Sequence, residues 1–460
     1  MRIKTKLSSV LLSFILIFST FNGAIVKADV NTTTAATGTL EQGREIIKDY
    51  YLETVPNSVL NKPSLTDIVS GLKDPYSHYF TAKEYSDFVN SINNSFCGIG
   101  VTMDIVPEGA KVIEVIDNSP ARDAGVKAGD IITEADGHNL AGLTNDQIVT
   151  YIKGTAGTAI DIKLKRAQNI LEFKIVRKQI DLPTVEAAVL NNNIGYIDIA
   201  SFGEKTGAEF SSVLSKMPNV DSYIIDLRDD GGGYISTAQD IAGYFIGNNP
   251  VVQLTDKTGA TEAYYAADHK VISDKPIIFL VNEDTASASE ILSAAVKDYG
   301  KAYFIGTKTY GKGVAQMMFP LSDGSVLKLT TYKFVSPYGS EINKVGMTPD
   351  LVLDDKYLNC IDPLKTAEIL LSSSASSSDK TGVTRLDVGS KTFQISPQIL
   401  KDPEYVQEAN YLMNYAQKTK DKRQVTSDKW QVTSDKWQVK EILPWVKIKQ
   451  LNKKGMLVDL

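Results

Sequence analysis

Apolar side chains recur at helical spacing through residues 40–94, where Ile46, Ile47 and Tyr50 belong to one stripe. Three prolines interrupt the stripe, and a proline ends or kinks a helix. The pattern therefore predicts a helical N-terminal segment that is broken at several points.

A β-rich pattern follows this segment. Residues 111–116 (KVIEVI) and 159–166 (AIDIKLKR) predict strands, and residues 145–153 between them predict a helix. Glycines and prolines separate these elements, as is usual for turns. We expect a small β-rich domain with one substantial helix.

Strand and helix patterns alternate from about residue 189 to residue 350. Residues 276–282 (PIIFLVN) predict a fully buried strand, and residues 290–296 predict the helix that follows it. The same alternation surrounds the apolar stretch at residues 223–228 (YIIDLR). Such alternation is typical of an α/β fold with a largely parallel sheet.

The N-terminus has the pattern of an export signal. Residues 1–28 combine a basic start, an apolar run at 7–21 and small residues around Val26 and Ala28. Residues 7–26 carry no charge, so the same segment is also long enough to remain as a membrane anchor. Either outcome predicts an extracytoplasmic protein, secreted or anchored to the outer face of the cytoplasmic membrane.

Composition and charge narrow the function. The formal net charge of −6 offers no basic footprint for nucleic acid. Two cysteines, Cys97 and Cys360, are too few for a disulfide framework, and their pairing stays open. His78, His138 and His269 share no metal-ligand spacing, so we expect no metal and no cofactor. A Ser/His/Asp triad through His269 remains an alternative for any serine chemistry.

Residues 285–290 (TASASE) carry the candidate chemistry. Ser287 lies at a predicted strand-to-helix turn, where backbone N–H groups are free to face an oxyanion. Lys312 stands between two glycines, and a buried, neutral lysine amine can accept the proton of a serine. The two residues predict a Ser/Lys dyad. The simpler alternatives are a capping box of Ser287 with Glu290 and a solvated surface lysine.

A glycine run follows the strand at residues 223–228. The segment DLRDDGGG (226–233) lacks the spacing of nucleotide-binding loops, and by itself it reads as a tight turn. Its glycines permit positive φ and expose backbone N–H groups. Opposite Ser287, such a turn would supply a second oxyanion donor.

Five motifs occur in one order, and together they resemble one family. They are GLKDPYSHYFTAKEY (71–85), DLRDDGGG (226–233), TASASEI (285–291), YGKGVAQ (310–316) and EINKVGMTPD (341–350). The chain resembles the carboxyl-terminal processing (tail-specific) proteases, exported serine peptidases with an embedded PDZ domain. The resemblance implies a ClpP/crotonase-like α/β protease core with an inserted PDZ domain and a helical N-terminal segment.

The resemblance also implies a role for each catalytic residue. Ser287 would be the nucleophile and Lys312 its base, with Gln316 as the partner that orients the lysine. We expect Gln316 to hydrogen-bond the amine from four residues away. Ser289 is the competing nucleophile, and we assign it to the helix turn. We expect Lys312 to lie in a dry pocket beside these apolar residues: Val314, Met317 and Met318.

Two backbone N–H groups would form the oxyanion hole. They are those of Ala288 and of Gly232, with Gly233 as the alternative to Gly232. One such donor is worth about 3 kcal/mol of transition-state stabilisation in comparable sites.

The GIGV segment resembles the carboxylate-binding turn of PDZ domains. The N–H groups of Ile99, Gly100 and Val101 would capture a free C-terminus, and the peptide would add as a β-strand. The family often has an arginine where this chain has Lys153, and a lysine makes a single-point contact instead of a fork.

The predicted domains follow from these observations. They are a signal or anchor (1–28), a spacer (29–39), a helical segment (40–95), a PDZ domain (96–180), a protease core (181–371), a serine-rich linker (372–383) and a C-terminal tail (384–460). The tail contains an exact tandem repeat of QVTSDKW at residues 424–437, whose role stays open.

The function implied by the resemblance is that of an exported serine endopeptidase. Its PDZ domain would select protein or peptide substrates by their free C-terminal tails. The family also suggests a homodimer formed through the helical N-terminal segment. The rival hypotheses are a non-catalytic PDZ scaffold of the cell envelope and an acyl hydrolase that acts on cell-wall peptides.

Overall fold

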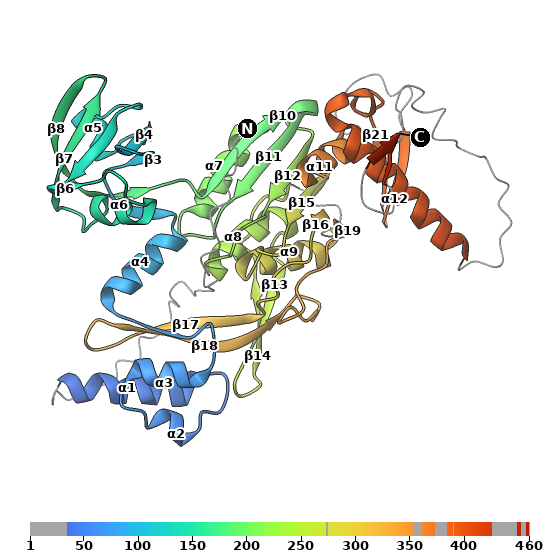
Figure 1. Ribbon diagram of the computed structural model, residues 1–460. Coiled ribbons are helices and arrows are strands. Elements are labelled where there is room, and N and C mark those ends of the chain that lie inside the picture. Colours follow the sequence, from blue (N-terminus) through green and yellow to red (C-terminus); the bar gives the residue numbers. More distant parts are fainter. Residues whose placement is uncertain are drawn as a thin grey trace.

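The computed structural model describes residues 35–272, 275–353, 361–372, 384–389, 391–425, 449–451 and 457–459 (Figure 1). The predicted export signal, most of the spacer and of the serine-rich linker, Cys360 and nearly all of the tandem repeat lie outside these residues. Within the described ranges, no helix combines the length and apolar character needed to cross a bilayer. The domain boundaries stay predictions.

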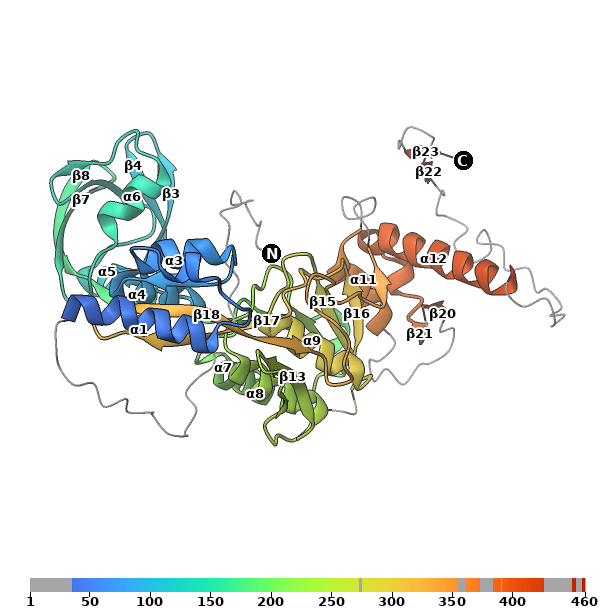
Figure 2. The same ribbon diagram turned by 90° about the horizontal axis from the view of Figure 1, so that it is seen from below.

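The N-terminal segment is helical, with one short strand. Its elements are α1 (Ala35–Tyr50), α2 (Asn57–Leu60), α3 (Leu65–Leu72), β1 (His78–Phe80) and α4 (Ala82–Ile92). Apolar residues of α1 and α3, including Ile47 and Ile68, pack against Leu327 and Leu329. These two leucines belong to a long hairpin formed by β17 (Val314–Pro320) and β18 (Val326–Val335). Figure 2 shows α1 lying along this hairpin. The apolar stripe that the sequence shows is therefore covered by the chain's own hairpin.

A β-rich unit, residues 95–181, follows α4 and has a separate core (Figure 1). Its sheet has the order β3-β4-β5-β7-β8, with β6 on β5. The elements are β3 (Val101–Val106), β4 (Gly109–Val115), α5 (Pro120–Ala124), β5 (Ile131–Ala135), β6 (His138–Asn139), α6 (Asn145–Ile152), β7 (Ala159–Arg166) and β8 (Asn169–Val176). Strands β2 (Ser95–Gly98) and β9 (Lys178–Asp181) pair where the unit joins the rest of the molecule.

The central sheet has six strands in the order β10-β11-β12-β15-β16-β19. Only the β10–β11 pair is antiparallel. The strands are β10 (Val185–Leu190), β11 (Ile194–Ile199), β12 (Ser222–Asp226), β15 (Ile277–Val281), β16 (Tyr303–Gly306) and β19 (Leu351–Val352). The alternating strand and helix pattern of the sequence thus corresponds to an α/β core with a largely parallel sheet.

Both faces of this sheet are covered, as parallel strands require. On one face, Ile225 and Phe279 pack under α7 (Thr206–Lys216), α8 (Ile235–Ile246) and α9 (Ala288–Asp298). On the other, Ile224 and Ile278 pack under a C-terminal layer. That layer consists of α11 (Pro363–Leu371), β20 (Thr384–Val388), β21 (Lys391–Ile395) and α12 (Val406–Val425). From the C-terminal tail, β20, β21 and the first part of α12 therefore complete the core.

A second sheet crosses the lower part of the molecule in Figure 1. Its order is β1-β18-β13-β14, and β17 pairs with β18. The strands are β13 (Pro250–Asp256), β14 (Thr261–Tyr265), β17 (Val314–Pro320) and β18 (Val326–Val335). Because β1 joins this sheet, the N-terminal segment is brought next to the segment that carries Lys312.

Candidate active site

The turn before α9 is held in a strained and well-anchored conformation. Thr285 donates its hydroxyl to the Leu227 carbonyl at 2.7 Å, and the Ala286 N–H donates to the Asp230 carbonyl at 3.0 Å. Ser287 itself has φ 65° and ψ −119°, a region that only glycine enters easily. Strain of this kind concentrates at functional sites, where the surrounding contacts enforce it.

Ser287 ends this turn, and its side chain is completely buried. Its hydroxyl makes no cap hydrogen bond and has no partner among the described residues. The backbone N–H of Ser287 donates to Glu290 at 2.9 Å, which is the carboxylate half of a capping box. The capping hypothesis thus accounts for Glu290 and leaves the serine hydroxyl unused.

Glu290 ties the serine turn to the segment that carries Lys312. Its Oε2 accepts the backbone N–H groups of Ser287 and Lys312, each at 2.9 Å. Its Oε1 accepts the Thr309 hydroxyl at 2.6 Å and the Gly311 N–H at 2.8 Å. Burial raises the pKa of Glu290, while these four donors oppose that rise. The backbones of the predicted nucleophile and base are therefore joined through one oxygen atom.

Lys312 lies in the loop before β17 and is completely buried. Burial lowers the pKa of its amine well below the ordinary value of 10.5. The charge of Lys328 lowers this pKa further, whereas Asp74 and Glu290 oppose the shift. The amine stands 5.0 Å from the ring centroid of Tyr76. The surface-lysine alternative is wrong, and the expected burial of Lys312 is confirmed.

Lys328 is a second buried lysine that the sequence reasoning missed. It is 2% exposed on β18, and its amine faces the rings of Phe80 and Phe88 at 5.6 and 5.1 Å. Burial lowers the pKa of Lys328 to about 8. The position of Lys328 between Leu327 and Leu329 was the available signal. Asp74 and Tyr76 belong to the motif at residues 71–85, to which the sequence analysis assigns no chemical role.

Gln316 does not make the hydrogen bond that we expected with the Lys312 amine. Its Nε2 donates to the Thr330 hydroxyl at 3.2 Å, and its Oε1 has no partner among the described residues. Lys312 precedes β17, and a bulge between Ala315 and Gln316 shifts the pairing with β18. The regular strand geometry behind the expectation is therefore absent. The catalytic role of Gln316 stays a prediction.

The glycine loop after β12 lies against the serine turn. A Cβ added at Gly232 would stand 2.8 Å from both the Ala288 nitrogen and the Ser287 Cβ. The same addition at Gly233 would meet the backbone of Phe202 instead. The Gly232 N–H, however, donates to Asp230 Oδ1 at 2.8 Å. Gly232 is adjacent to Ser287 and Ala288, with its N–H already engaged.

The two alternative serine chemistries find less support in the geometry. The Ser289 hydroxyl is buried and donates to the Asp230 carbonyl at 3.1 Å. His269 lies 2.6 Å from Asp240 and stacks on Tyr244 at 4.1 Å between ring centroids. Because the Ser287 hydroxyl has no hydrogen-bond partner in the described ranges, His269 does not pair with it.

The predicted tail-binding residues lie in the β-rich unit. Ile99 is buried, and Gly100 has φ +85°, packed so that an added Cβ would meet Ser119 at 2.2 Å. Val101 begins β3, next to this turn. Lys153 ends α6, with its amine 5.4 Å from the ring centroid of Phe96. These residues belong to a different unit from Ser287 and Lys312.

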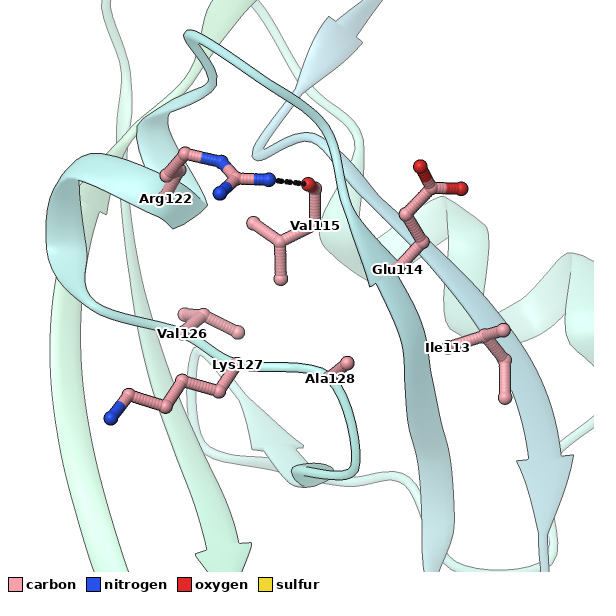
Figure 3. A pocket seen from close by; sticks show the side chains of 7 residues that line it. All are labelled: Ile113, Glu114, Val115, Arg122, Val126, Lys127 and Ala128. Carbon is pink, nitrogen blue, oxygen red and sulfur yellow. Dashed lines mark hydrogen bonds between the residues drawn. The ribbon is translucent and has the colours of Figure 1, made fainter.

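The β-rich unit also contains a pocket that the sequence reasoning missed (Figure 3). Its volume is about 320 Å³, and it opens between β4 and the segment after α5. Arg122 points across it to the Val115 carbonyl, to which it donates at 2.5 Å (Figure 3). The lining residues are Ile113, Glu114, Val115, Arg122, Val126, Lys127 and Ala128. This pocket includes none of the predicted tail-binding residues.

Comparisons with known proteins agree on one family. Residues 193–353 match peptidase family S41, and residues 97–176 match the PDZ domain. The carboxy-terminal processing protease CtpB of Bacillus subtilis is 32% identical over 343 residues, covering 72% of this chain and 70% of that protein. A probable CtpA-like serine protease of Staphylococcus aureus is 31% identical over 382 residues, covering 81% and 77%. Among solved structures, the photosystem II D1 C-terminal processing protease aligns with 70% of this chain and 94% of its own, at 23% identity and a TM-score of 0.46.

Proposed function

The chain belongs to peptidase family S41, as a carboxy-terminal processing serine protease with a PDZ domain, and from this premise we propose the chemistry of its site. The protein is an exported endopeptidase in which Ser287 attacks the substrate and Lys312 acts as its base. Its PDZ domain selects substrates by their free C-terminal tails.

One observation carries the proposed dyad. A completely buried lysine, whose pKa burial lowers, is joined by its backbone to the turn of a buried serine through Glu290 Oε2. A neutral amine can accept a proton, and a serine hydroxyl without a competing hydrogen bond is available to give one. A charged surface lysine could not accept that proton.

The reaction then proceeds through an acyl-enzyme. The Ser287 Oγ bonds to the carbonyl carbon of the scissile peptide while its proton passes to Lys312 Nζ. The protonated amine gives this proton to the leaving amine nitrogen as the peptide C–N bond breaks. Water, deprotonated by the same lysine, attacks the ester carbon, and the lysine returns the proton to Ser287 Oγ as the ester C–O bond breaks. The N–H groups of Ala288 and Gly232 are proposed to stabilise the oxyanion in both stages.

Substrate selection is assigned to the PDZ domain. The turn formed by Ile99, Gly100 and Val101 is proposed to bind the terminal carboxylate, with Lys153 near the bound peptide. The positive φ of Gly100 supports this proposal, because a turn of this kind directs successive N–H groups to one side. A peptide with an amidated C-terminus should therefore be a poor substrate.

Location and assembly complete the proposal. We assign export to residues 1–28, with secretion and membrane anchoring as the two outcomes. A homodimer through the N-terminal helices would use the surface of these helices that faces away from the β17–β18 hairpin, because their apolar stripe packs on that hairpin. Family membership favours this protease over a non-catalytic scaffold or a cell-wall acyl hydrolase.

The test compares two substitutions with two matched controls. Ser287→Ala and Lys312→Ala should each abolish cleavage of a peptide with a free apolar C-terminus, with folding unchanged by circular dichroism. Ser293→Ala removes a buried hydroxyl from the same helix, and Lys301→Ala removes an exposed lysine, so both should remain active. Normal turnover by either dyad variant would refute the mechanism. Equal cleavage of the amidated peptide would refute tail selection alone.

A further inference from the structure

The glycine loop holds a carboxyl group that the proposed mechanism does not use. Asp230 is completely buried between β12 and α8. Its Oδ1 accepts the Gly232 N–H at 2.8 Å, and its Oδ2 has no hydrogen-bond partner among the described residues. An ionised carboxylate with one donor is costly to bury, so this group is expected to keep its proton.

The neighbouring groups compensate a negative charge on Asp230 only in part. From the serine turn, the Ala286 N–H and the Ser289 hydroxyl donate to its main-chain carbonyl at 3.0 and 3.1 Å. The Gly232 N–H and the Ser289 hydroxyl oppose the rise in the pKa of the Asp230 carboxyl group without cancelling it. From β11, Asp198 adds a second negative charge. Burial is the main cause that raises the pKa of Asp230 well above 3.8, and Asp198 adds to it.

Arg228, the cation of the same loop, already pairs with another carboxylate. Arg228 donates to both carboxylate oxygens of Asp226, at 2.8 and 2.5 Å. Asp226 also accepts the Tyr196 hydroxyl at 2.8 Å. Asp226 therefore has the partners that stabilise an ionised carboxylate, whereas the carboxyl group of Asp230 accepts one backbone N–H.

Asp230 acts directly on a predicted oxyanion donor. Gly232 packs against Ser287 and Ala288, and it adopts φ +95°, which a side chain would resist. The Gly232 N–H can donate to the substrate oxyanion only if its hydrogen bond to Asp230 Oδ1 breaks. A carboxylate accepts an N–H about twice as strongly as a neutral group does. A carboxylate at this position would also repel the developing oxyanion.

We propose that Asp230 is a positioning residue that must stay protonated: as a neutral acid it holds the Gly232 N–H in the resting site and releases it to the substrate oxyanion. Ionisation of Asp230 strengthens its hydrogen bond to the Gly232 N–H, so this N–H no longer donates to the substrate oxyanion. The inference rests on the proposed oxyanion hole, and it assigns to Asp230 an upper pH limit for catalysis. Loss of one such donor costs about 10²–10³-fold in kcat.

Asp230→Asn separates the neutral acid from its ionised form. Asparagine keeps the acceptor oxygen and cannot ionise. The wild-type kcat/KM for a tail peptide should rise with pH as Lys312 loses its proton, and then fall about 100-fold as Asp230 loses its own. Asp230→Asn should show the same rise without the fall. Asp229→Asn, the same change at the exposed neighbour, should behave like the wild type.

Stability provides a second measurement that does not depend on activity. In the unfolded chain Asp230 ionises near its ordinary pKa of 3.8, so the wild type should lose stability relative to Asp230→Asn as pH rises above about 4. Urea unfolding of the full chain, in a Ser287→Ala background, measures this gap. The gap should widen with pH and level off where wild-type activity falls.

Three results would overturn the inference. They are a gap that does not change with pH, an alkaline fall of equal size in both proteins, and no alkaline fall in the wild type after the gap has levelled off. Failure of the dyad itself would appear differently, as activity in Ser287→Ala or Lys312→Ala. The stability gap would be unaffected by that outcome.

Discussion

Two buried carboxyl groups flank the Ser287 turn, and their surroundings differ. On the side of Lys312, Glu290 accepts four hydrogen bonds, two on each oxygen. On the side of the glycine loop, Asp230 accepts one through Oδ1, and its Oδ2 has no partner among the described residues. The lysine side is therefore fixed by a completed network, and the oxyanion side retains groups that can still rearrange.

This difference matches what the proposed mechanism requires of the two sides. A general base has to be held at one position throughout the reaction, because a small displacement of a catalytic group costs much of its effect. An oxyanion donor is needed only when negative charge develops on the substrate. A resting site can therefore keep Lys312 fixed while the Gly232 N–H is engaged elsewhere.

The largest effect is expected for Glu290→Gln. Each oxygen of Glu290 accepts two donors, so the amide nitrogen of glutamine would face two donors that it cannot accept. Unsatisfied buried donors cost about 1–3 kcal/mol each, so we expect a loss of about 3 kcal/mol in the free energy of unfolding. Activity should fall more than 100-fold, since both catalytic backbones lose a shared partner.

Urea unfolding and a peptide assay measure both quantities. Glu283→Gln is the matched control, because Glu283 is exposed and its side chain accepts a hydrogen bond from Thr307. Asp230→Asn should change stability in the opposite direction at neutral pH. If both variants were destabilised alike, the two carboxyls would not differ as described.

The next effect tests whether charge also tunes the lysine side. Lys328 carries its charge below about pH 8 and lowers the pKa of Lys312. Lys328→Met removes this charge, so the pKa of Lys312 should rise and the rising limb of the pH–rate profile should move to higher pH. At pH 7 we expect kcat/KM to fall about tenfold, a part of the 10²–10⁴-fold that a positioned base contributes.

The profile is measured from pH 5 to pH 10. The difference between the two proteins should shrink above pH 8, where Lys328 of the wild type loses its own charge. Lys333→Met, an exposed change on the same strand, should leave the profile in place. An unshifted rising limb in Lys328→Met would show that burial alone lowers the pKa of Lys312.

The smallest effect concerns a single member of the Glu290 network. Thr309 donates to Glu290 at 2.6 Å and accepts the Met347 N–H at 2.7 Å. Thr309→Val keeps the shape and removes both bonds, so we expect a loss of about 1–2 kcal/mol in the free energy of unfolding. Thr307→Val, at a less buried position, is the control. If Thr309→Val lowered the free energy of unfolding as much as Glu290→Gln, the Thr309 hydroxyl alone would account for the stabilisation that the four donors provide.

Local patterns were sufficient for much of the fold and of the site. The apolar run at 276–282 corresponds to β15, and the small-residue turn after it places Ser287 at the start of α9. The sequence predicted a buried lysine between two glycines, and Lys312 is buried in a loop whose glycines pack against the backbone of residues 343–346. These features are encoded within a few residues, so they can be read without knowing the rest of the structure.

Contacts between distant segments could not be read in the same way. Gln316 pairs with Thr330 because the register between β17 and β18 shifts at a bulge, where Thr331 of β18 is skipped. Lys328 lies near Phe80 and Phe88 because β1 pairs with β18. β20, β21 and α12, which help to cover the second face of the central sheet, fall in the segment that was expected to be a separate tail. None of these pairings has a local pattern, since register and packing depend on the whole chain.

The sequence by itself determined the order of the elements, the α/β class of the core and the identities of the serine, the lysine and the glycine loop. Only the tertiary structure decided which groups surround them: four donors for Glu290, one for Asp230 and a second buried lysine beside Lys312. The physical reason is that the residue type determines which hydrogen bonds a side chain is able to make. Burial and the neighbours supplied by distant segments decide which bonds form and which protonation state persists.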